Sequence, residues 1–407
     1  NITMLPIKNM DSAPLKCIST KIQINTYFCI MNLIYLDSAA TTSMDPEVIK
    51  VMQSSMKHNF GNPSSTHQFG RKAKSALETA RKNIAHHFNV TASEIVFTAG
   101  GTEADNLILH NAVTHLGVQR IISTKIEHHA VSHTITHLQK KYGIAVDYLN
   151  VDEFGTADLE HLEALLSNTT QKTLVSLMLI NNEIGNILPA DLVCALCNKY
   201  NALFHSDTVQ VVGHYPLDLQ KTPIDFMVAS AHKFHGPKGV GFAFFRKGFG
   251  IMPMFHGGDQ ERGARSSTEN VHAILGMETA LDIAIGGMEH DKIKIQKIKN
   301  YFIQQLKKLN SKIAFNGLSA DADKGTYTIL NVRFPSNNEM LLFSLDLAGI
   351  AVSGGSACQS GSSSGSHVLQ EILKDRASNN TSIRFSFSKL TTQQDIDTTL
   401  LKLQALL

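Results

Sequence analysis

The sequence has no tryptophan and only five cysteines among its 407 residues. An odd number of cysteines without framework spacing argues against a disulfide-built secreted protein and favours a reducing, cytoplasmic compartment. Basic residues form no block and the formal net charge is +2, so charge predicts neither a nucleic-acid partner nor an anionic membrane surface. No apolar run approaches the ~20 residues that a membrane helix needs. We therefore expect no nucleic-acid partner and no membrane segment.

The remaining composition is that of a globular chain. Apolar residues make up 43% and charged residues 18% of the sequence, as in folded soluble proteins. A chain of 407 residues exceeds what one hydrophobic core serves, so two or more domains are expected. Residues 1–30 lack an initiating Met and any periodicity, whereas Met31 opens a stretch that resembles a natural start. We interpret residues 1–30 as a disordered or non-native leader.

Helical and strand patterns alternate from about residue 45, which predicts an α/β fold with a mainly parallel sheet covered by helices. Helical spacing of apolar residues is found at 46–60, 71–88, 103–117 and 131–143. Short apolar runs typical of buried strands lie at 94–100, 119–130, 173–185, 202–210, 226–236 and 239–247. A long helical stretch, 273–310, precedes two strand patterns at 326–334 and 382–388 that enclose a helix at 338–349.

This order predicts two domains. The large domain covers residues 46–290 and binds the ligand. The small α+β domain combines residues 31–45 and 291–407, and it carries the Gly/Ser-rich loop 353–367 with Cys358. The pair Cys194 and Cys197 forms a C-x-x-C motif, but it lies within a helical apolar pattern without a second Cys/His pair. We expect these two thiols to be packed in a helix rather than redox-active or metal-bound.

Polar residues follow the ends of the expected strands, where ligands of open parallel sheets bind. They are Gly100–Thr102, Glu127–His128, Asn181–Glu183, Asp207–Gln210 and Ser230–Lys233. The segment FTAGGTEADN places a glycine turn before a helix, so its backbone N–H groups and Thr102 form a candidate anion site. It matches neither the P-loop nor G-x-G-x-x-G, and a plain helix cap explains Thr102 equally well.

Lys233 lies between His232 and His235 in a loop bounded by Gly and Pro. Burial there would lower the pKa of the amine, as an imine-forming lysine requires. A solvated loop lysine is the plainer interpretation, and Lys238 is a competing candidate.

Asp207 directly follows an expected buried strand and therefore needs a cationic partner. A protonated pyridine nitrogen would supply one, with Gln210 reaching a ring oxygen; a structural salt bridge is the alternative. Together with the anion site, the lysine, and His128 as an aromatic cover for a ring, these residues predict a pyridoxal 5'-phosphate site.

As a set, these motifs resemble those of the NifS/IscS-type cysteine desulfurases, in the class V aminotransferase branch of the fold-type I pyridoxal phosphate enzymes. The resemblance runs from YLDSAATT at residue 35 to SIRFSFS at 382–388. It includes GNPSSTH, FTAGGTEADN, IEHHAV, NNEIG, HSDTVQ, SAHKFHGPKG, HGGDQERGARSSTEN and SGGSACQSG. Two departures are mild, since Gly101 stands where Ala is frequent and Ala231 where Gly is common.

The resemblance implies a role for each matching residue. The catalytic residues that it implies are Cys358, Lys233 and His128, and those that hold the substrate carboxylate are Asn182 and Arg384. The cofactor-binding residues are Lys233, Thr102, Gly101, His128, Asp207, Gln210, Ser230, His232 and, from the neighbouring subunit of a homodimer, Thr268. The implied reaction converts L-cysteine to L-alanine and leaves the sulfur as a persulfide on Cys358. A sulfur-acceptor protein, either an iron–sulfur scaffold or a sulfur carrier for tRNA thiolation, would then take it.

Other interpretations stay open from the sequence. A preference for selenocysteine, as in a selenocysteine lyase, cannot be read from these residues. A non-catalytic scaffold would be indicated by loss of Lys233 or Cys358, but both are present. A metal-binding protein is suggested by nineteen histidines and the pair His133/His137. No further residue completes a recognised ligand set, so we expect no metal.

Overall fold

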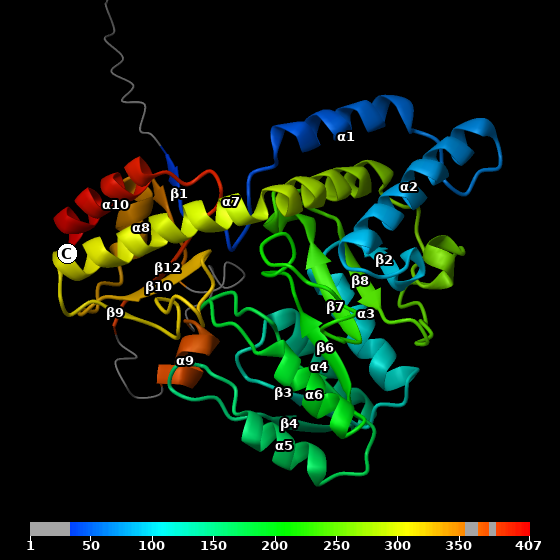
Figure 1. Cartoon of the computed structure of the whole chain (residues 1–407), viewed down its shortest axis with the longest axis horizontal. Helices are drawn as coiled ribbons and strands as arrows, with labels where there is room; N and C mark the ends of the chain where they lie inside the picture. The colour runs from blue at the N-terminus through cyan, green and yellow to red at the C-terminus, as the bar shows by residue number, and fades with distance from the viewer. Residues whose placement is uncertain (1–32, 355–364, 374–379) are drawn as a thin grey trace, which may run out of the picture. The chain divides into compact units, whose positions relative to one another are not determined.

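A seven-stranded sheet is the largest sheet in the part of the chain that the computed structural model describes, residues 33–354, 365–373 and 380–407. Its strand order is β2-β8-β7-β6-β5-β3-β4 (Figure 1). β8 runs antiparallel to both neighbours and the other adjacent strands pair in parallel, which confirms the predicted mainly parallel sheet. The strands are β2 (Ile95–Thr98), β3 (Arg120–Ser123), β4 (Ala145–Tyr148), β5 (Thr173–Ser176), β6 (Leu203–Asp207), β7 (Phe226–Ser230) and β8 (Gly241–Phe245).

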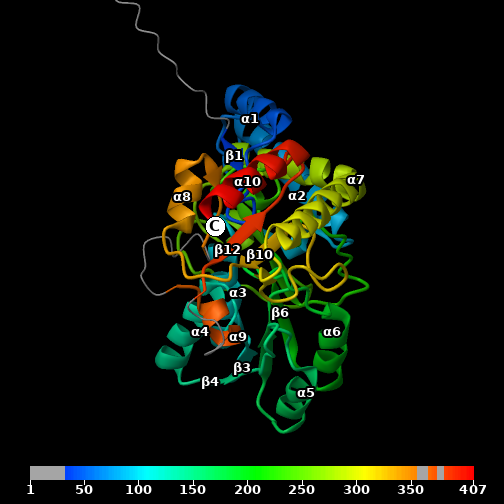
Figure 2. The ribbon, with the colours of Figure 1, turned by 90° about the vertical axis from the view of Figure 1, so that its left-hand side faces the viewer.

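Helices cover both faces of this sheet, because its strands are apolar on both sides. On one face, α3 (Gly101–Thr114) and α4 (His129–Tyr142) pack on Ile121, Leu174 and Val228. On the other face, the sheet side chains contact α2 (Gln68–His87), α5 (Leu159–Ser167), α6 (Ala190–Lys199) and the first half of α7 (Val271–Leu309). Figure 2 shows α4 and α6 on opposite sides of the strands.

A second core surrounds two smaller sheets near the C-terminal end of α7. β10 (Ile329–Arg333) pairs antiparallel with β9 (Ala314–Phe315) and β12 (Ser382–Ser386), and β1 (Ile34–Tyr35) pairs in parallel with β11 (Ile350–Ala351). The remaining helices are α1 (Pro46–His58), α8 (Leu341–Leu347), α9 (His367–Leu373) and α10 (Gln393–Leu406), and the short 3-10 helices are η1 (Ala92–Glu94), η2 (Ala231–Lys233) and η3 (Gln260–Gly263).

The hydrophobic cores follow the expected division of the chain, but the domain boundaries stay a prediction. The buried residues of the second core come from 34–36 and 295–403, whereas those around the large sheet come from 48–281. Residues 33–407 nevertheless form one compact unit. Residues 1–30 and Cys358 lie outside the described residues.

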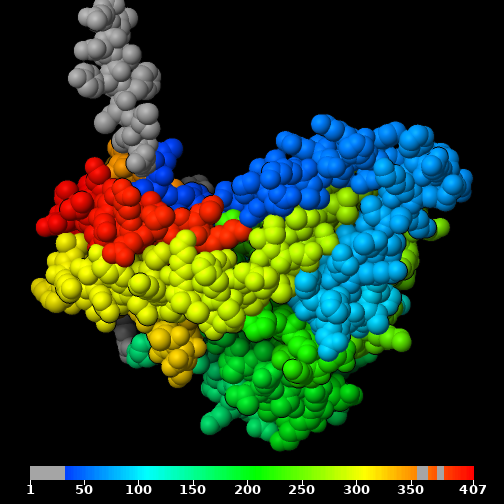
Figure 3. All heavy atoms as spheres, turned by 45° about the horizontal axis from the view of Figure 1, so that its top comes forward, coloured from blue at the N-terminus to red at the C-terminus, as the bar shows by residue number. Residues whose placement is uncertain are grey.

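α7 connects these cores. Its first half contributes Met277 and Leu281 to the core of the large sheet, and its second half contributes Phe302 and Leu306 to the second core. Figure 3 shows α1 beside the first half and α10 beside the second. By length and composition alone, α7 could cross a membrane, and it is the single such helix in the described ranges. Its part in both cores accounts for the apolar composition.

β4 and α5 are among the elements that the sequence-based assignment missed, together with α9, α10 and the short strands β1, β9 and β11. β4 is an edge strand with partly exposed side chains, and α5 is a short helix after it. β4 lacks the continuous apolar run that marks the buried strands. The C-x-x-C pair lies in α6 as expected: Cys194 and Cys197 are buried, both thiols are free, and burial raises the pKa of Cys194 to about 12.

Lys299, in the second half of α7, is a buried amine. Only 1% of it is exposed, and its Nζ donates a hydrogen bond to the carbonyl of Thr326 at 2.5 Å. Burial lowers its pKa from 10.5 to about 7. Between these values the unfolded chain binds more protons than the folded chain at this site, so the contribution of Lys299 makes stability rise with pH.

We predict that Lys299→Met removes this dependence. Between pH 7 and pH 10, the free energy of unfolding of the wild type should rise relative to that of the variant by about 1 kcal/mol per pH unit. Denaturant unfolding at several pH values measures it. Lys297→Met, at an exposed position of the same helix, is the control and should keep the wild-type slope. Parallel pH profiles for wild type and Lys299→Met would contradict a neutral buried amine.

Candidate active site

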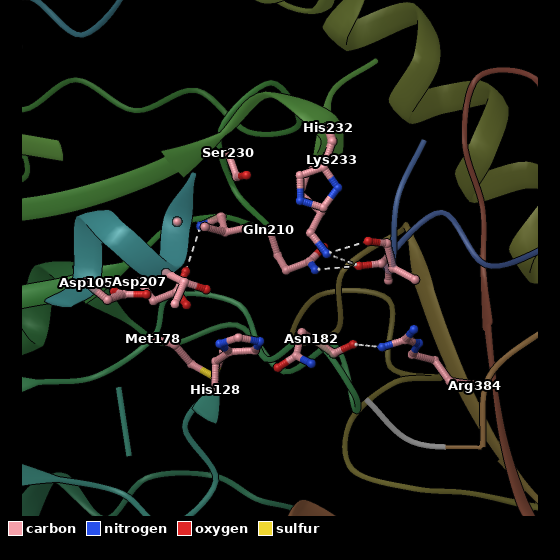
Figure 4. A pocket seen from close by; sticks show the side chains of 15 residues that line it. Asp105, His128, Met178, Asn182, Asp207, Gln210, Ser230, His232, Lys233 and Arg384 are labelled. Atoms are coloured by element: carbon pink, nitrogen blue, oxygen red, sulfur yellow. Dashed lines mark hydrogen bonds between the residues drawn. The ribbon is translucent and has the colours of Figure 1, made fainter. Parts of the chain in front are cut away.

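A cavity of about 170 Å³ lies at the carboxyl ends of the strands of the large sheet (Figure 4). Most residues that the sequence singles out line it, although they come from segments far apart in the chain. These are Gly101, Thr102, His128, Asn182, Asp207, Gln210, Ser230, His232, Lys233 and Arg384. The structure therefore brings the predicted lysine, carboxylate, glycine turn and arginine to one place.

The glycine turn between β2 and α3 forms one wall. Gly100 has φ +153°, and Gly101 begins α3. A Cβ at Gly241, on the adjacent β8, would lie 2.3 Å from the carbonyl oxygen of Ala229 and 2.9 Å from the Cα of Gly100. This close backbone approach leaves the first turn of α3 facing the cavity beside Thr102 and Ser230. First-turn amides of a helix have no acceptor within the helix, so this wall is suited to an anion.

Lys233 ends the short helix η2, directly after β7. Its Nζ donates to the carbonyls of Ala39 and Ala40 at 2.5 and 2.9 Å. The loop that carries Lys233 is also held by a backbone hydrogen bond, in which Thr42 donates its N–H to the carbonyl of His232 at 2.8 Å. The amine thus projects into the cavity from a loop that is tied to residues 39–42.

His232 is a neutral imidazole at ordinary pH. Its Nδ1 lies 3.2 Å from the hydroxyl of Thr41. Burial, with a further contribution from the ammonium groups of Lys233 and Lys238, lowers its pKa to about 4. His232 is therefore able to offer a hydrogen bond to an anion without carrying a charge of its own.

Asp207 ends β6 and is 6% exposed. Its Oδ1 accepts the backbone N–H of Val209 at 2.9 Å, which fixes the carboxylate at the cavity wall. Gln210 is held nearby, since its Nε2 donates to the carbonyl of Ala39 at 3.1 Å.

His128 caps α4. Its Nδ1 accepts the backbone N–H of Ala130 at 3.1 Å, so the ring proton of the neutral form is on Nε2. The cap fixes the ring at the cavity, where an aromatic cover for a flat ligand is expected.

Arg384 and Asn182 lie at the other side of the cavity. Arg384 is 1% exposed; its Nη1 donates to the carbonyl of Asn182 at 2.9 Å and its Nη2 to Oδ1 of Asp37 at 2.8 Å. Its Nε has no partner among the described residues. The guanidinium is thus oriented by two fixed acceptors and keeps donors for a further carboxylate.

Not every predicted residue lies at this cavity. Thr268 is exposed and lines a separate surface hollow with Phe255 and Arg265. Glu127 and Asn181 follow strand ends as expected but are buried in contacts with the backbone, Glu127 with Met178 and Asn181 with Ile126. Cys358 lies outside the described residues.

Four lining residues were missing from the sequence-based assignment: Ala39, Ala40, Asp105 and Met178. Ala39 and Ala40 act through their carbonyls, and backbone contacts leave no signal in residue type. Asp105 stands one helical turn after the glycine turn, within the motif FTAGGTEADN. Its acidic side chain inside an otherwise apolar helix face was the available signal.

Comparison with known proteins assigns the family. The model of the aminotransferase class-V family matches residues 34–399. The chain belongs to this family, whose members are pyridoxal phosphate-dependent enzymes.

Within it, the chain is similar to cysteine desulfurases of the NifS/IscS type. It is 39% identical over 378 residues to the cysteine desulfurase IscS of Dictyoglomus turgidum, which covers 90% of this chain and 92% of the relative. A solved NifS-like protein is 36% identical with a TM-score of 0.84, covering 92% of this chain and 99% of that one. A structure described as SspA in complex with cysteine is 29% identical with a TM-score of 0.75, covering 88% and 100%.

The cavity fits the family's cofactor by the chemistry of its donors. It offers an amine on Lys233, a carboxylate on Asp207 and an anion wall where a Cβ at Gly101 would lie 2.8 Å from Cγ2 of Val209. These groups match an aldehyde, a ring nitrogen and a phosphate, respectively.

We predict that Lys233→Ala abolishes covalent binding of pyridoxal phosphate. The visible absorption of the bound cofactor should be lost, and turnover should fall by about 10²- to 10⁴-fold, because an imine-forming amine would also serve as base. Lys238→Ala is the matched control: Lys238 is exposed and lines a neighbouring hollow, so this variant should keep the absorption. Normal absorption in Lys233→Ala with loss in Lys238→Ala would assign the role to the other lysine.

Proposed function

We propose that the protein is a pyridoxal phosphate-dependent cysteine desulfurase that converts L-cysteine to L-alanine and transfers the sulfur through Cys358. The observation that carries the proposal is the convergence of Lys233, Asp207 and Arg384 on one cavity in a chain that matches cysteine desulfurases over most of its length.

The cofactor supplies an electron-withdrawing ring that makes the substrate's Cα proton acidic. Lys233 would hold it covalently and, once the substrate amine has replaced Lys233, take the Cα proton at its Nζ. Asp207 would keep the ring nitrogen protonated, and Gln210 would donate to the ring oxygen. Gly101, Thr102, Ser230 and His232 would bind the phosphate together with the first turn of α3.

The substrate carboxylate would bind to Arg384 and Asn182. Asp37 and the carbonyl of Asn182 already fix the guanidinium plane, so little side-chain entropy is lost when the substrate binds. His128, whose ring proton is on Nε2, would cover the ring and assist proton transfer at the substrate.

The sulfur step uses the thiolate of Cys358. Its Sγ would attack the sulfur of the bound cysteine, so that an S–S bond forms while the Cβ–S bond breaks. The electron pair of that bond goes to Cβ, which takes up a proton to become the methyl group of alanine. The two sulfur atoms are oxidised to a persulfide by two electrons, and Cβ is reduced by the same two electrons, so the step needs no external oxidant or reductant. An acceptor protein then removes the persulfide sulfur, and we propose iron–sulfur cluster assembly or tRNA thiolation as its use.

The proposal includes a cytoplasmic homodimer. Thr268 lies apart from the cavity, which supports a role toward the phosphate of the neighbouring subunit rather than its own.

The decisive variant is Cys358→Ser. We expect it to keep the cofactor absorption and to bind L-cysteine, but to release alanine and sulfide only at background rates, because the hydroxyl is not a sulfur nucleophile. Alanine release and labelling of the persulfide measure this.

Cys194→Ala is the control for this experiment. Cys194 is buried with a raised thiol pKa and therefore has little thiolate, so its replacement should leave turnover intact. Full turnover by Cys358→Ser would exclude the proposed sulfur step.

A further inference from the structure

A line of polar groups is buried behind the cavity, on the sheet face that α3 covers. His205 and Asp207 are two residues apart in β6, so their side chains point to the same face of the sheet. Asp105 of α3 lies over that face and also lines the cavity. Figure 4 shows Asp105 beside Asp207. Asp105 is 1% and His205 0% exposed.

Two buried atoms in this line lack a hydrogen-bond partner in the described residues: Oδ1 of Asp105 and Nε2 of His205. They face each other at 3.3 Å, the outer edge of hydrogen-bonding distance. On the other side of the ring, Nδ1 of His205 lies 2.9 Å from the hydroxyl of Ser176. Ser123 in turn donates its hydroxyl to the carbonyl of Ser176 at 2.8 Å, across adjacent strands.

The carboxyl groups around this line cannot all be charged. Asp105 interacts electrostatically with Asp207 and Glu127, and it contacts His205. Burial and these like charges raise the pKa of Asp105 well above its usual value, and burial together with Asp207 raises that of Glu127 to about 8. Burial lowers the pKa of His205 to about 3, so the imidazole does not supply a compensating charge.

On these contacts, we propose that Asp105 is a positioning residue for the cofactor site. It is protonated, donates its O–H to Nε2 of a neutral His205, and leaves Asp207 as the single carboxylate charge at the cavity wall. This inference rests on the proposed function only for the identity of the ligand that Asp207 faces.

The alternative is an ion pair of Asp105 with protonated His205. The N-terminal end of α3 favours negative charge, but the effect falls off within the first turn and Asp105 is the fifth residue of the helix. Burying both charges costs more than their single 3.3 Å contact regains, even with the hydroxyl of Ser176 beside Nδ1 of the ring. A neutral acid–imidazole hydrogen bond avoids that cost.

The pair has a consequence for the reaction. A second ionised carboxylate beside Asp207 would bind the protonated ring nitrogen too strongly and change the acidity of the ring. A neutral Asp105 leaves the ring nitrogen with one carboxylate partner, Asp207. Its hydrogen bond also fixes His205, two residues before Asp207 in the same strand. Asp105 therefore acts through His205 and Asp207.

The protonation state is tested by infrared difference spectroscopy of the full chain at neutral pH, with and without pyridoxal phosphate. The wild-type spectrum minus that of Asp105→Asn should show the C=O band of a neutral carboxyl group, shifted in heavy water. Glu127→Gln identifies the separate band of Glu127. A difference spectrum with only carboxylate bands would overturn the protonated state of Asp105. This arm does not depend on the proposed function.

The positioning role is tested by the dissociation constant of pyridoxal phosphate and the pH midpoint of its absorption. Asp105→Asn keeps a neutral donor for His205, so both quantities should stay within about twofold of wild type. Asp105→Ala and His205→Ala should each weaken binding by about tenfold, as for one lost hydrogen bond to a buried group. The double variant should also lose only about tenfold, because both changes break the same contact.

Three outcomes would overturn the role: wild-type affinity in Asp105→Ala, additive losses in the double variant, or a shifted midpoint in Asp105→Asn. Failure of every form, wild type included, to bind the cofactor would instead reject the proposed function, and the infrared result would still decide the state of Asp105.

Discussion

Thr42 donates its backbone N–H to the carbonyl of His232, and its hydroxyl accepts the N–H of His235. Through these two hydrogen bonds, residues 37–42 connect the loop of Lys233 to the small sheets. The same short segment accepts the amine of Lys233, the amide of Gln210 and the guanidinium of Arg384. Three groups from separate parts of the chain therefore take their positions from one stretch of backbone. If this segment shifted, the amine, the amide and the guanidinium would all lose their alignment.

Burial controls the charges at the cavity. His232 and His205 are neutral because burial lowers the pKa of each imidazole. Burial and the nearby carboxylate of Asp207 raise the pKa values of Asp105 and Glu127. The guanidinium of Arg384 pairs with the carboxylate of Asp37. Asp207 and Arg384 thus lie where ligand groups of opposite charge are proposed to bind, and the buried imidazoles nearby act as neutral donors and acceptors.

Much of the fold could be predicted from the sequence because the buried strands have distinct apolar runs. Strands β2, β3, β5, β6, β7 and β8 all lie within such runs. β4 was missed because an edge strand is only partly buried and its apolar signal is weak. Among site residues, Lys233, Asp207 and Thr102 lie at the end of a strand or within four residues of it, so topology alone places them at one edge. The contributions of Ala39 and Ala40 could not be predicted, since a carbonyl oxygen is present in every residue.

The sequence by itself determined the mainly parallel sheet, the glycine turn and the family, because these depend on local pattern and on motifs in chain order. Only the tertiary structure decided which groups share a cavity wall and which are neutral. It separated Thr268 from the cavity, tied the guanidinium of Arg384 to Asp37, and set Asp105 against His205 behind Asp207. The physical reason is that burial and pairing belong to contacts between distant residues, and those contacts exist only once the chain has folded.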